Sequence, residues 1–522
     1  MRRTIDQTID AVRVSGGTVL DLSGRRIRKL PESIRGLTSV TSLRLSGCHL
    51  IELPGWLGEL TDLTDLRLDD NRLTDLPASI GNLTKLDLSG NRFTELPASV
   101  ANLMDLKALR LWGNGLARLP AWLGNLAELT RLDLSGNQMV TVPASIGNLT
   151  KLVELRLSSN QLTDLPASIG NLADLMRLDL DHNHLARLPV TIGDLAGLIR
   201  LDAGENQLSE LPTSAGHLER LTDLRLCGNQ LTELPASIGN LAGLATLDLA
   251  HNQLEHLPPS IGNLANLTEL HLHGNRLAEL PTSVGNLTRL THLALWGNRL
   301  SELPATMADL TELTELLMAS NRFTEVPVFL GSLTNLTQLD LAGNRLSGLP
   351  ASLRNLTALT WLFLNNNELT ELPNWLNELT AIAALRLSRN HLTGVPASIG
   401  HLVHLTQLDL ANNHLRELPA SARNLTNLDG LSLNGNRFTK LPEWFGELTA
   451  LTQLDLSENQ LTELPTQIGN LTALTTLNLR DNKLSELPAS FRELTALTWL
   501  DVSGNPLVTP PPSYPKWRPM TR

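Results

Sequence analysis

Residues 221–241 read LTDLRLCGNQLTELPASIGNL. The same pattern, LxxLxLxxNxLxxLPxxIGxL, recurs from about residue 20 to residue 505, and its asparagine, here Asn229, marks the phase of each unit. The first leucines alternate with polar residues, which predicts a short strand. Proline is excluded from central strands, so the LP pair predicts that the chain has left the sheet there. Each unit is therefore expected to be a strand followed by an irregular or short helical return segment.

The spacing of the phase residue shows how often the unit repeats. From Asn91 to Asn505 is 414 residues (505 − 91), which is eighteen steps of 23. Counting back from Asn71 in steps of 23 reaches Cys48 and Arg25. A fixed period of this size is typical of repeat architectures, and it predicts about 22 repeats.

The pattern and its period resemble the leucine-rich repeat family. The variant with LP and IGNL, as in LPASIGNL at residues 234–241, is similar to the intracellular Ras-group type. This resemblance covers nearly the whole chain. It implies an α/β solenoid, a horseshoe or superhelix with a continuous parallel β-sheet on its concave face. It also implies protein binding on that face, and it implies no chemistry.

The alternation within a unit assigns its residues to two sides of the sheet. In the expected strand at residues 131–135, Leu132 and Leu134 point inward and the residues between them point to the concave face. Asn137 turns inward, where its amide is expected to bond the backbone of its own turn and of the next repeat, because a buried polar group needs partners. Cys48, at the same position, is a small buried substitute with a weak donor.

One unit is shorter than the others, since Asn71 and Asn91 are 20 residues apart (91 − 71). The deletion is either tolerated in the convex arc or produces a local kink. The expected organisation is an N-terminal helical cap at 1–17, a solenoid at 18–505 and a C-terminal cap or tail at 506–522. The apolar residues of segment 4–14 have helical spacing. No GTPase domain is expected after the tail.

Composition restricts the partners and the compartment. The net charge is −11, which argues against a nucleic-acid backbone as the main partner because phosphate binding needs clustered lysines and arginines. Cys48 and Cys227 are too far apart in a rigid array for a disulfide, and cysteine-rich caps are absent. The N-terminus lacks the apolar segment of a secretory signal, and no run of 18 apolar residues is present. We therefore expect a cytoplasmic protein without a membrane span.

No enzyme signature is present, neither a phosphate-binding loop nor a zinc-protease motif nor a nucleophile elbow. The many Asp, Ser and Thr residues recur in phase, which is typical of architecture. The sequence therefore predicts no catalysis and no cofactor.

The primary partner-binding patch is predicted at concave positions two, four and six residues before the phase residue, from the twelfth repeat onward. Large apolar side chains on a rigid exposed sheet have no core role, and tryptophan is enriched in interface hot spots. The alternatives are drift on an unselected surface and packing on neighbouring side chains. The predicted patch comprises His271, His273, His292, Trp296, Leu317, Trp361 and Phe363. Trp112 and Trp499 occupy equivalent columns as weaker single candidates.

A second candidate surface is a nearly alternating ladder of opposite charges, four residues before the phase residue. Adjacent strands are about 4.8 Å apart, so these side chains either neutralise one another or form a charged recognition face. The ladder comprises Arg67, Asp87, Arg110, Asp133, Arg156 and Asp179.

The histidines allow a metal site as a minor hypothesis. His271 and His273 share a face of one strand and His292 lies on the next, so the three could hold zinc or another divalent ion, although a neutral polar patch is favoured.

The sequence thus predicts a non-catalytic scaffold or adaptor that binds a protein partner. Two alternatives remain open: a regulatory subunit of a separately encoded signalling GTPase or kinase, and a secreted bacterial effector or adhesin. A carbohydrate ligand at Trp296, Trp361 and Phe363 is a minor further one. The oligomeric state is not determined, with a monomer favoured.

Overall fold

The computed structural model describes residues 4–508 of the 522-residue chain. The residues form two compact units, which meet in sequence between Leu267 and Thr268. We call them unit 1 and unit 2 and describe each by itself. Most of the predicted C-terminal segment at 506–522, including its proline run, lies outside the described residues. Among the residues described, no helix has both the length and the apolar character needed to cross a bilayer.

Each repeat contributes one three-residue strand. Unit 1 contains β1 (Val19–Asp21), β2 (Ser42–Arg44), β3 (Asp65–Arg67), β4 (Lys85–Asp87), β5 (Ala108–Arg110), β6 (Arg131–Asp133), β7 (Glu154–Arg156), β8 (Arg177–Asp179), β9 (Arg200–Asp202), β10 (Asp223–Arg225) and β11 (Thr246–Asp248). Unit 2 contains β12 (Glu269–His271), β13 (His292–Ala294), β14 (Glu315–Leu317), β15 (Gln338–Asp340), β16 (Trp361–Phe363), β17 (Ala384–Arg386), β18 (Gln407–Asp409), β19 (Gly430–Ser432), β20 (Gln453–Asp455), β21 (Thr476–Asn478) and β22 (Trp499–Asp501). These 22 strands match the predicted number of repeats.

Neighbouring strands within a unit are parallel and in register. Leu132 pairs with Leu155 in unit 1, and Leu339 pairs with Leu362 in unit 2. A step of one repeat therefore moves from a residue to its equivalent on the next strand. Side chains at equivalent positions form columns that run across the strands.

The return segments are 3-10 helices, nearly all five residues long. Unit 1 has η1 (Glu32–Ile34), η2 (Gly55–Glu59), η3 (Ala98–Asn102), η4 (Ala121–Asn125), η5 (Ala144–Asn148), η6 (Ala167–Asn171), η7 (Val190–Asp194), η8 (Thr213–His217), η9 (Ala236–Asn240) and η10 (Pro259–Asn263). Unit 2 has η11 (Thr282–Asn286), η12 (Ala305–Asp309), η13 (Val328–Ser332), η14 (Ala351–Asn355), η15 (Asn374–Glu378), η16 (Ala397–His401), η17 (Ala420–Asn424), η18 (Glu443–Glu447), η19 (Thr466–Asn470) and η20 (Ala489–Glu493).

The sequence explains where these short helices begin and end. Pro235 precedes η9 in an extended conformation, and Leu241 ends it with a φ of −79° and a ψ of 57°, outside the helical region. Gly239 lets η9 stack on the next repeat, because a Cβ there would lie 2.5 Å from the carbonyl oxygen of Ser260. The LPxxIGxL motif is therefore a requirement of close stacking.

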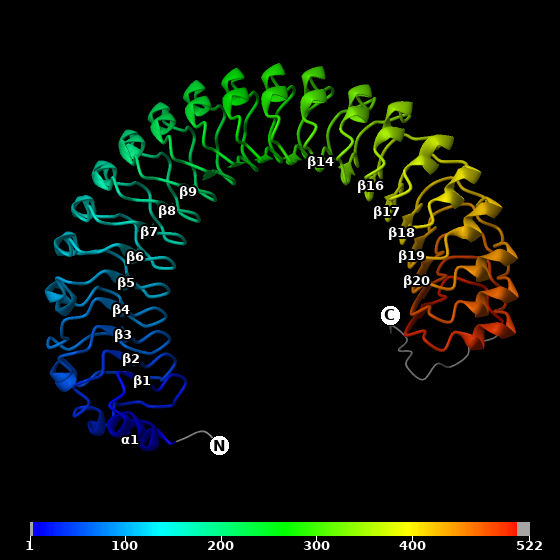
Figure 1. Cartoon of the computed structure of the whole chain (residues 1–522). Coiled ribbons are helices and arrows are strands. Elements are labelled where there is room, and N and C mark those ends of the chain that lie inside the picture. The colour runs from blue at the N-terminus through cyan, green and yellow to red at the C-terminus, as the bar shows by residue number, and fades with distance from the viewer. Residues whose placement is uncertain (1–3, 509–522) are drawn as a thin grey trace. The chain divides into compact units, whose positions relative to one another are not determined.

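Within each unit, the strands lie on one side and the 3-10 helices on the other (Figure 1). We call these sides the strand face and the helix face. The leucines of the motif fill the space between them, and Leu132, Leu134 and Ile146 are at most 1% exposed. The strand face thus carries only the side chains that alternate with the core leucines.

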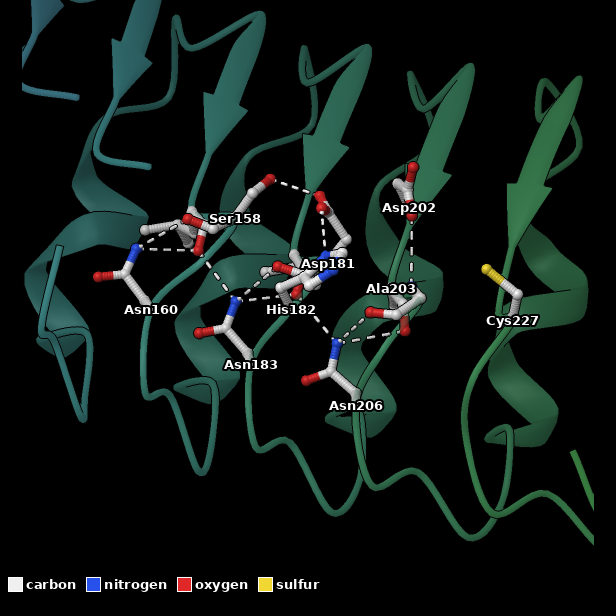
Figure 2. Close-up of polar contacts among 12 residues, drawn as sticks. Ser158, Asn160, Asp181, His182, Asn183, Asp202, Ala203, Asn206 and Cys227 are labelled. Carbon is white, nitrogen blue, oxygen red and sulfur yellow. Dashed lines mark hydrogen bonds and ion pairs between the residues drawn. The ribbon is translucent and has the colours of Figure 1, made fainter. Parts of the chain in front are cut away.

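The phase asparagines form a buried ladder, of which Figure 2 shows three consecutive members. The Asn183 amide donates to the carbonyl of Leu157 (3.0 Å) and accepts from the N–H of Leu162 (3.0 Å). Both partners belong to the preceding repeat, so the predicted bond to the next repeat was wrong in direction. Leu162 comes just after the turn that ends the strand of its repeat, so its N–H takes no part in the strand pairing. The side-chain oxygen of Asn183 accepts the hydrogen bond from this N–H. Cys48 replaces this bond with a contact from its sulfur to the carbonyl of Leu22 (3.1 Å).

The 20-residue repeat keeps its strand side intact. Leu66 pairs with Leu86 in the usual register, and the amide of Asn91 donates to the carbonyl of Leu68 at 2.8 Å. In the described chain, no 3-10 helix lies between η2 and η3. The deletion is therefore absorbed on the helix face, as the first of the two readings expected.

The helix expected at residues 4–14 is present as α1 (Ile5–Ser15). Thr4 and Gln7 form a capping box at its start, and Gly16 ends it in the left-handed conformation. Ile9 is fully buried, so the helix covers core at the start of unit 1.

Candidate functional site

The predicted patch residues all lie on the strand face of unit 2, on or just after β12, β13, β14 and β16. We call the seven residues His271, His273, His292, Trp296, Leu317, Trp361 and Phe363 the aromatic patch. They form two clusters, because β15 carries Gln338 and Asp340 in the same columns. The patch is therefore elongated across strands.

The first cluster centres on a stacked pair. The rings of His273 and Trp296 lie 4.3 Å apart at an angle of 18°. His271 meets His273 edge to face, with centroids 6.1 Å apart. Trp296 remains 36% exposed. This side chain therefore packs on a neighbour and is also open to solvent. Stacking holds the indole in one orientation on the strand face.

The imidazoles of this cluster have separate partners. His271 lies 3.8 Å from Glu269. His292 lies 3.9 Å from Glu315 and 2.8 Å from the hydroxyl of Thr291. No group of three His, Cys, Asp or Glu side chains suited to a metal ion occurs among residues 4–508. The arrangement therefore gives no support to the metal hypothesis for His271, His273 and His292.

The second cluster contains a residue that the sequence reasoning missed. Trp361 and Phe363 stack with ring centroids 6.1 Å apart, and the guanidinium of Arg386 lies 4.6 Å from the centre of the Phe363 ring. Such a cation–π contact favours a fixed arrangement. Arg386 is in the same column as Phe363, one repeat later, so reading that column would have found it. Trp361 is 45% exposed and offers the outer surface.

Polar side chains separate the two clusters. The amide of Gln338 donates to Glu315 at 2.9 Å. Asp340 accepts from the N–H of Ala342 at 2.9 Å, and burial raises the pKa of its carboxyl. Leu317 lies partly exposed beside them on β14. A partner that covers both clusters must therefore also satisfy a polar strip between them.

The charged ladder lies on the strand face of unit 1, and the structure shows mutual neutralisation. Arg110 lies 3.4 Å from Asp87, and Arg156 lies 3.8 Å from Asp133 and 3.5 Å from Asp179. Arg67 differs, since it pairs within its own strand with Asp65 at 3.6 Å. The pairs are partly exposed, so each contributes at most about 1 kcal/mol.

Asp179 is the most buried member of the ladder. Its side chain is 7% exposed and lies within ion-pair distance of Arg156, Arg177 and Arg200, at 3.5, 2.8 and 3.8 Å. Arg177 and Arg200 come from the column six residues before the phase residue, which the ladder prediction left out. The two columns together form one network, and its internal pairing leaves less charge for a partner.

Cys227 lies on the same face, in the repeat that follows the one carrying Asp202 (Figure 2). Burial, with the nearby carboxylate of Asp248 adding to it, raises the pKa of the Cys227 thiol to about 12. Burial also raises the pKa of the neighbouring Asp202 carboxyl. The thiol is therefore protonated and inert at neutral pH.

We expect iodoacetamide to alkylate Cys227 about 30-fold more slowly in the folded chain than in urea at pH 8. The thiolate fraction falls about a thousandfold when the pKa rises by three units, and the greater nucleophilicity of the thiolate recovers part of this loss. Peptide mass spectrometry over time measures the rate. Equal rates in both states would show that the thiol titrates normally.

Family models identify the fold independently. A model described as "Leucine-rich repeat region" matches residues 96–179, 212–316, 261–343 and 376–459. Models described as "Leucine rich repeat" match residues 334–392, 458–507 and 82–103. These matches cover more than half of the chain, which therefore belongs to the leucine-rich repeat family. No curated protein sequence matches it.

Solved structures agree with this assignment. A leucine-rich repeat protein of Leptospira interrogans is 33% identical, with 78% of this chain and 94% of that chain covered and a TM-score of 0.63. The Arabidopsis receptor kinase HAESA, in complex with the peptide hormone IDA and a co-receptor, is 32% identical over 89% and 82% of the two chains, with a TM-score of 0.69. The plant peptide hormone receptor RGFR1 in complex with RGF2 is 28% identical over 93% and 92%, with a TM-score of 0.68.

Proposed function

We propose that this protein is a non-catalytic scaffold that binds a polypeptide partner on the strand face of unit 2. The observation that carries the proposal is the pair of indoles, Trp296 and Trp361, that remain more than one-third exposed on rigid strands. Isolated exposed apolar residues need no explanation, but each of these indoles lies in a cluster of aromatic side chains, and such clusters mark contact sites. Similar chains in complex with peptide hormones support a polypeptide as the ligand.

The two clusters suit this role because their side chains are already ordered. Trp296 is stacked on His273, and Phe363 lies between Trp361 and Arg386. Immobilising a flexible side chain on binding costs about 0.5–1.5 kcal/mol. Much of that cost is already met here in the free protein. The charged ladder is the weaker candidate, because its charges pair with one another.

A cytoplasmic location and a part in signal transduction belong to the proposal. Both cysteines are free thiols, which suits a reducing compartment. In this reading the protein is an adaptor or the regulatory partner of a separately encoded enzyme. It carries no catalytic step of its own.

Photo-crosslinking tests the location of the site. We expect p-benzoylphenylalanine at position 317 to crosslink a protein in lysate of the source cell, because Leu317 lies between the two clusters. The matched control is the same photoreactive residue at position 305, since Ala305 is exposed on the helix face of the preceding repeat. Mass spectrometry identifies the adduct. Equal crosslinking at both positions would contradict a site on the strand face.

A further inference from the structure

A hollow lies on the strand face of unit 2, beyond the aromatic patch. It spans β17 to β22 and has a volume of about 300 Å³. Leu408, Leu431 and Leu454 contribute apolar lining, and each is at most 4% exposed. Ligand sites of small molecules begin at about this size. The hollow can therefore take one small group.

Gly430 lies in the middle of this lining, on β19. It stands six residues before the phase residue, and the other 21 members of that column all carry a side chain. Glycine weakens a strand interior, and it often marks a point where another group approaches closely. An added Cβ would lie 2.3 Å from the side-chain oxygen of Gln407. The side chain of Gln407 therefore packs directly over Gly430, and position 430 adds no side chain of its own to the lining.

Hydrogen-bonding groups line the hollow on both sides of the glycine. Asp409 and Asp455 each bond a backbone N–H through Oδ1, at 3.0 and 2.9 Å, which leaves their Oδ2 atoms for a ligand. The hydroxyls of Ser432 and Thr476 and the amide of Gln453 belong to the same lining. The lining therefore offers acceptors beside groups that both donate and accept.

The charge of the lining favours a neutral ligand. Arg386 and Asp409 are partners in the strand register, so the lining contains one positive charge and one negative charge on neighbouring strands. With Asp455 as a second carboxylate, the lining carries one more negative charge than positive charges, which disfavours an anionic ligand. The guanidinium of Arg386 in the same lining disfavours a second cation.

Trp499 completes the lining at β22. Its half-buried indole offers an apolar surface beside the polar groups. A ligand that uses the whole lining needs hydroxyls that donate and accept, together with one apolar face. A pyranose ring has both.

We propose that the hollow at Gly430 binds the ring of a neutral saccharide. The hydroxyls of the saccharide donate hydrogen bonds to the carboxylates of Asp409 and Asp455. They also donate to and accept from the side chains of Ser432, Gln453 and Thr476. Hydrogen bonds to carboxylates are the stronger ones. This site adjoins the second cluster through Arg386, but its lining contains none of the seven residues of the aromatic patch, and it does not depend on the proposed protein partner.

Saturation-transfer NMR with the methyl glycosides of glucose, mannose, galactose and N-acetylglucosamine tests the proposal on the full chain. At least one should bind with a Kd on the order of 1 mM. Gly430→Leu should weaken that binding at least about tenfold, because the leucine and the Gln407 side chain that it displaces would fill the hollow. The control Ala108→Leu adds a leucine in the same column of unit 1 and should leave binding unchanged.

A second variant keeps the test independent of folding. Gln453 is exposed, so Gln453→Ala should weaken binding with no change in melting temperature. The proposal is overturned if no glycoside binds, if both substitutions leave binding intact, or if methyl glucuronide or N-acetylarginine amide binds instead. These results would leave crosslinking at position 317 unaffected, so the two proposals fail separately.

Discussion

Replacing Trp296 and Trp361 together with alanine should reduce partner affinity at least about 100-fold. Truncating a hot-spot tryptophan costs about 2 kcal/mol or more, and the two lie in separate clusters. Neither indole fills the core, since they are 36% and 45% exposed. The fold should therefore be unchanged. Affinity capture from lysate of the source cell, with wild type and double variant compared by mass spectrometry, measures the loss.

Trp112→Ala is the matched control for this experiment. Trp112 is 53% exposed on the strand face of unit 1, so its removal deletes the same kind of side chain outside the aromatic patch. Its variant should capture the partner as wild type does. Equal recovery with the double variant would move the site to the charged ladder of unit 1. A changed circular dichroism spectrum would instead make the tryptophans structural.

Asn229→Ala should lower the free energy of unfolding by about 1–3 kcal/mol, the cost of orphaning a buried hydrogen-bonding group. The Asn229 amide donates to the carbonyls of Ala203 (2.9 Å) and Leu226 (3.0 Å) and accepts from the N–H of Leu208 (2.9 Å). The substitution leaves the Leu208 N–H inside the protein without its acceptor. Urea denaturation followed by circular dichroism measures the change.

The adjacent Gln230→Ala is the control for stability, because Gln230 is exposed in the same turn. Its effect should stay within about 0.5 kcal/mol, as is usual for surface positions. If Asn229→Ala unfolds at the same urea concentration as wild type, the asparagine hydrogen bonds do not stabilise the array.

The repeat made the fold predictable from sequence. Alternating leucines such as Leu132 and Leu134 assigned core and strand face correctly, because the side-chain period of a strand is two. The 23-residue step predicted which residues share a column, and the strand register confirms it within each unit. The sequence also predicted that the phase asparagines are hydrogen-bonded to the backbone, because a polar group in the core needs hydrogen-bond partners.

The direction of the asparagine bonds could not be predicted in the same way. Asn183 has backbone groups within reach in its own turn and in two adjacent repeats, and the pattern treats these repeats alike. After the turn of the preceding repeat, the path of the chain gives the Leu162 N–H no backbone acceptor, and the side chain of Asn183 accepts this hydrogen bond instead. The tertiary structure therefore decided which neighbour is bonded.

For the candidate site, the sequence determined only which column of the strand face each side chain occupies. The sequence placed Trp296, Trp361 and Phe363 on the strand face, because period and phase fix the side of the sheet. The stack of Trp296 on His273 and the contact of Arg386 with Phe363 depend on side-chain rotamers across strands, which a column does not specify. The same holds for the three arginines around Asp179 and the hollow beside Gly430. Periodicity determined which face each side chain occupies, whereas packing between neighbouring repeats decided which side chains meet.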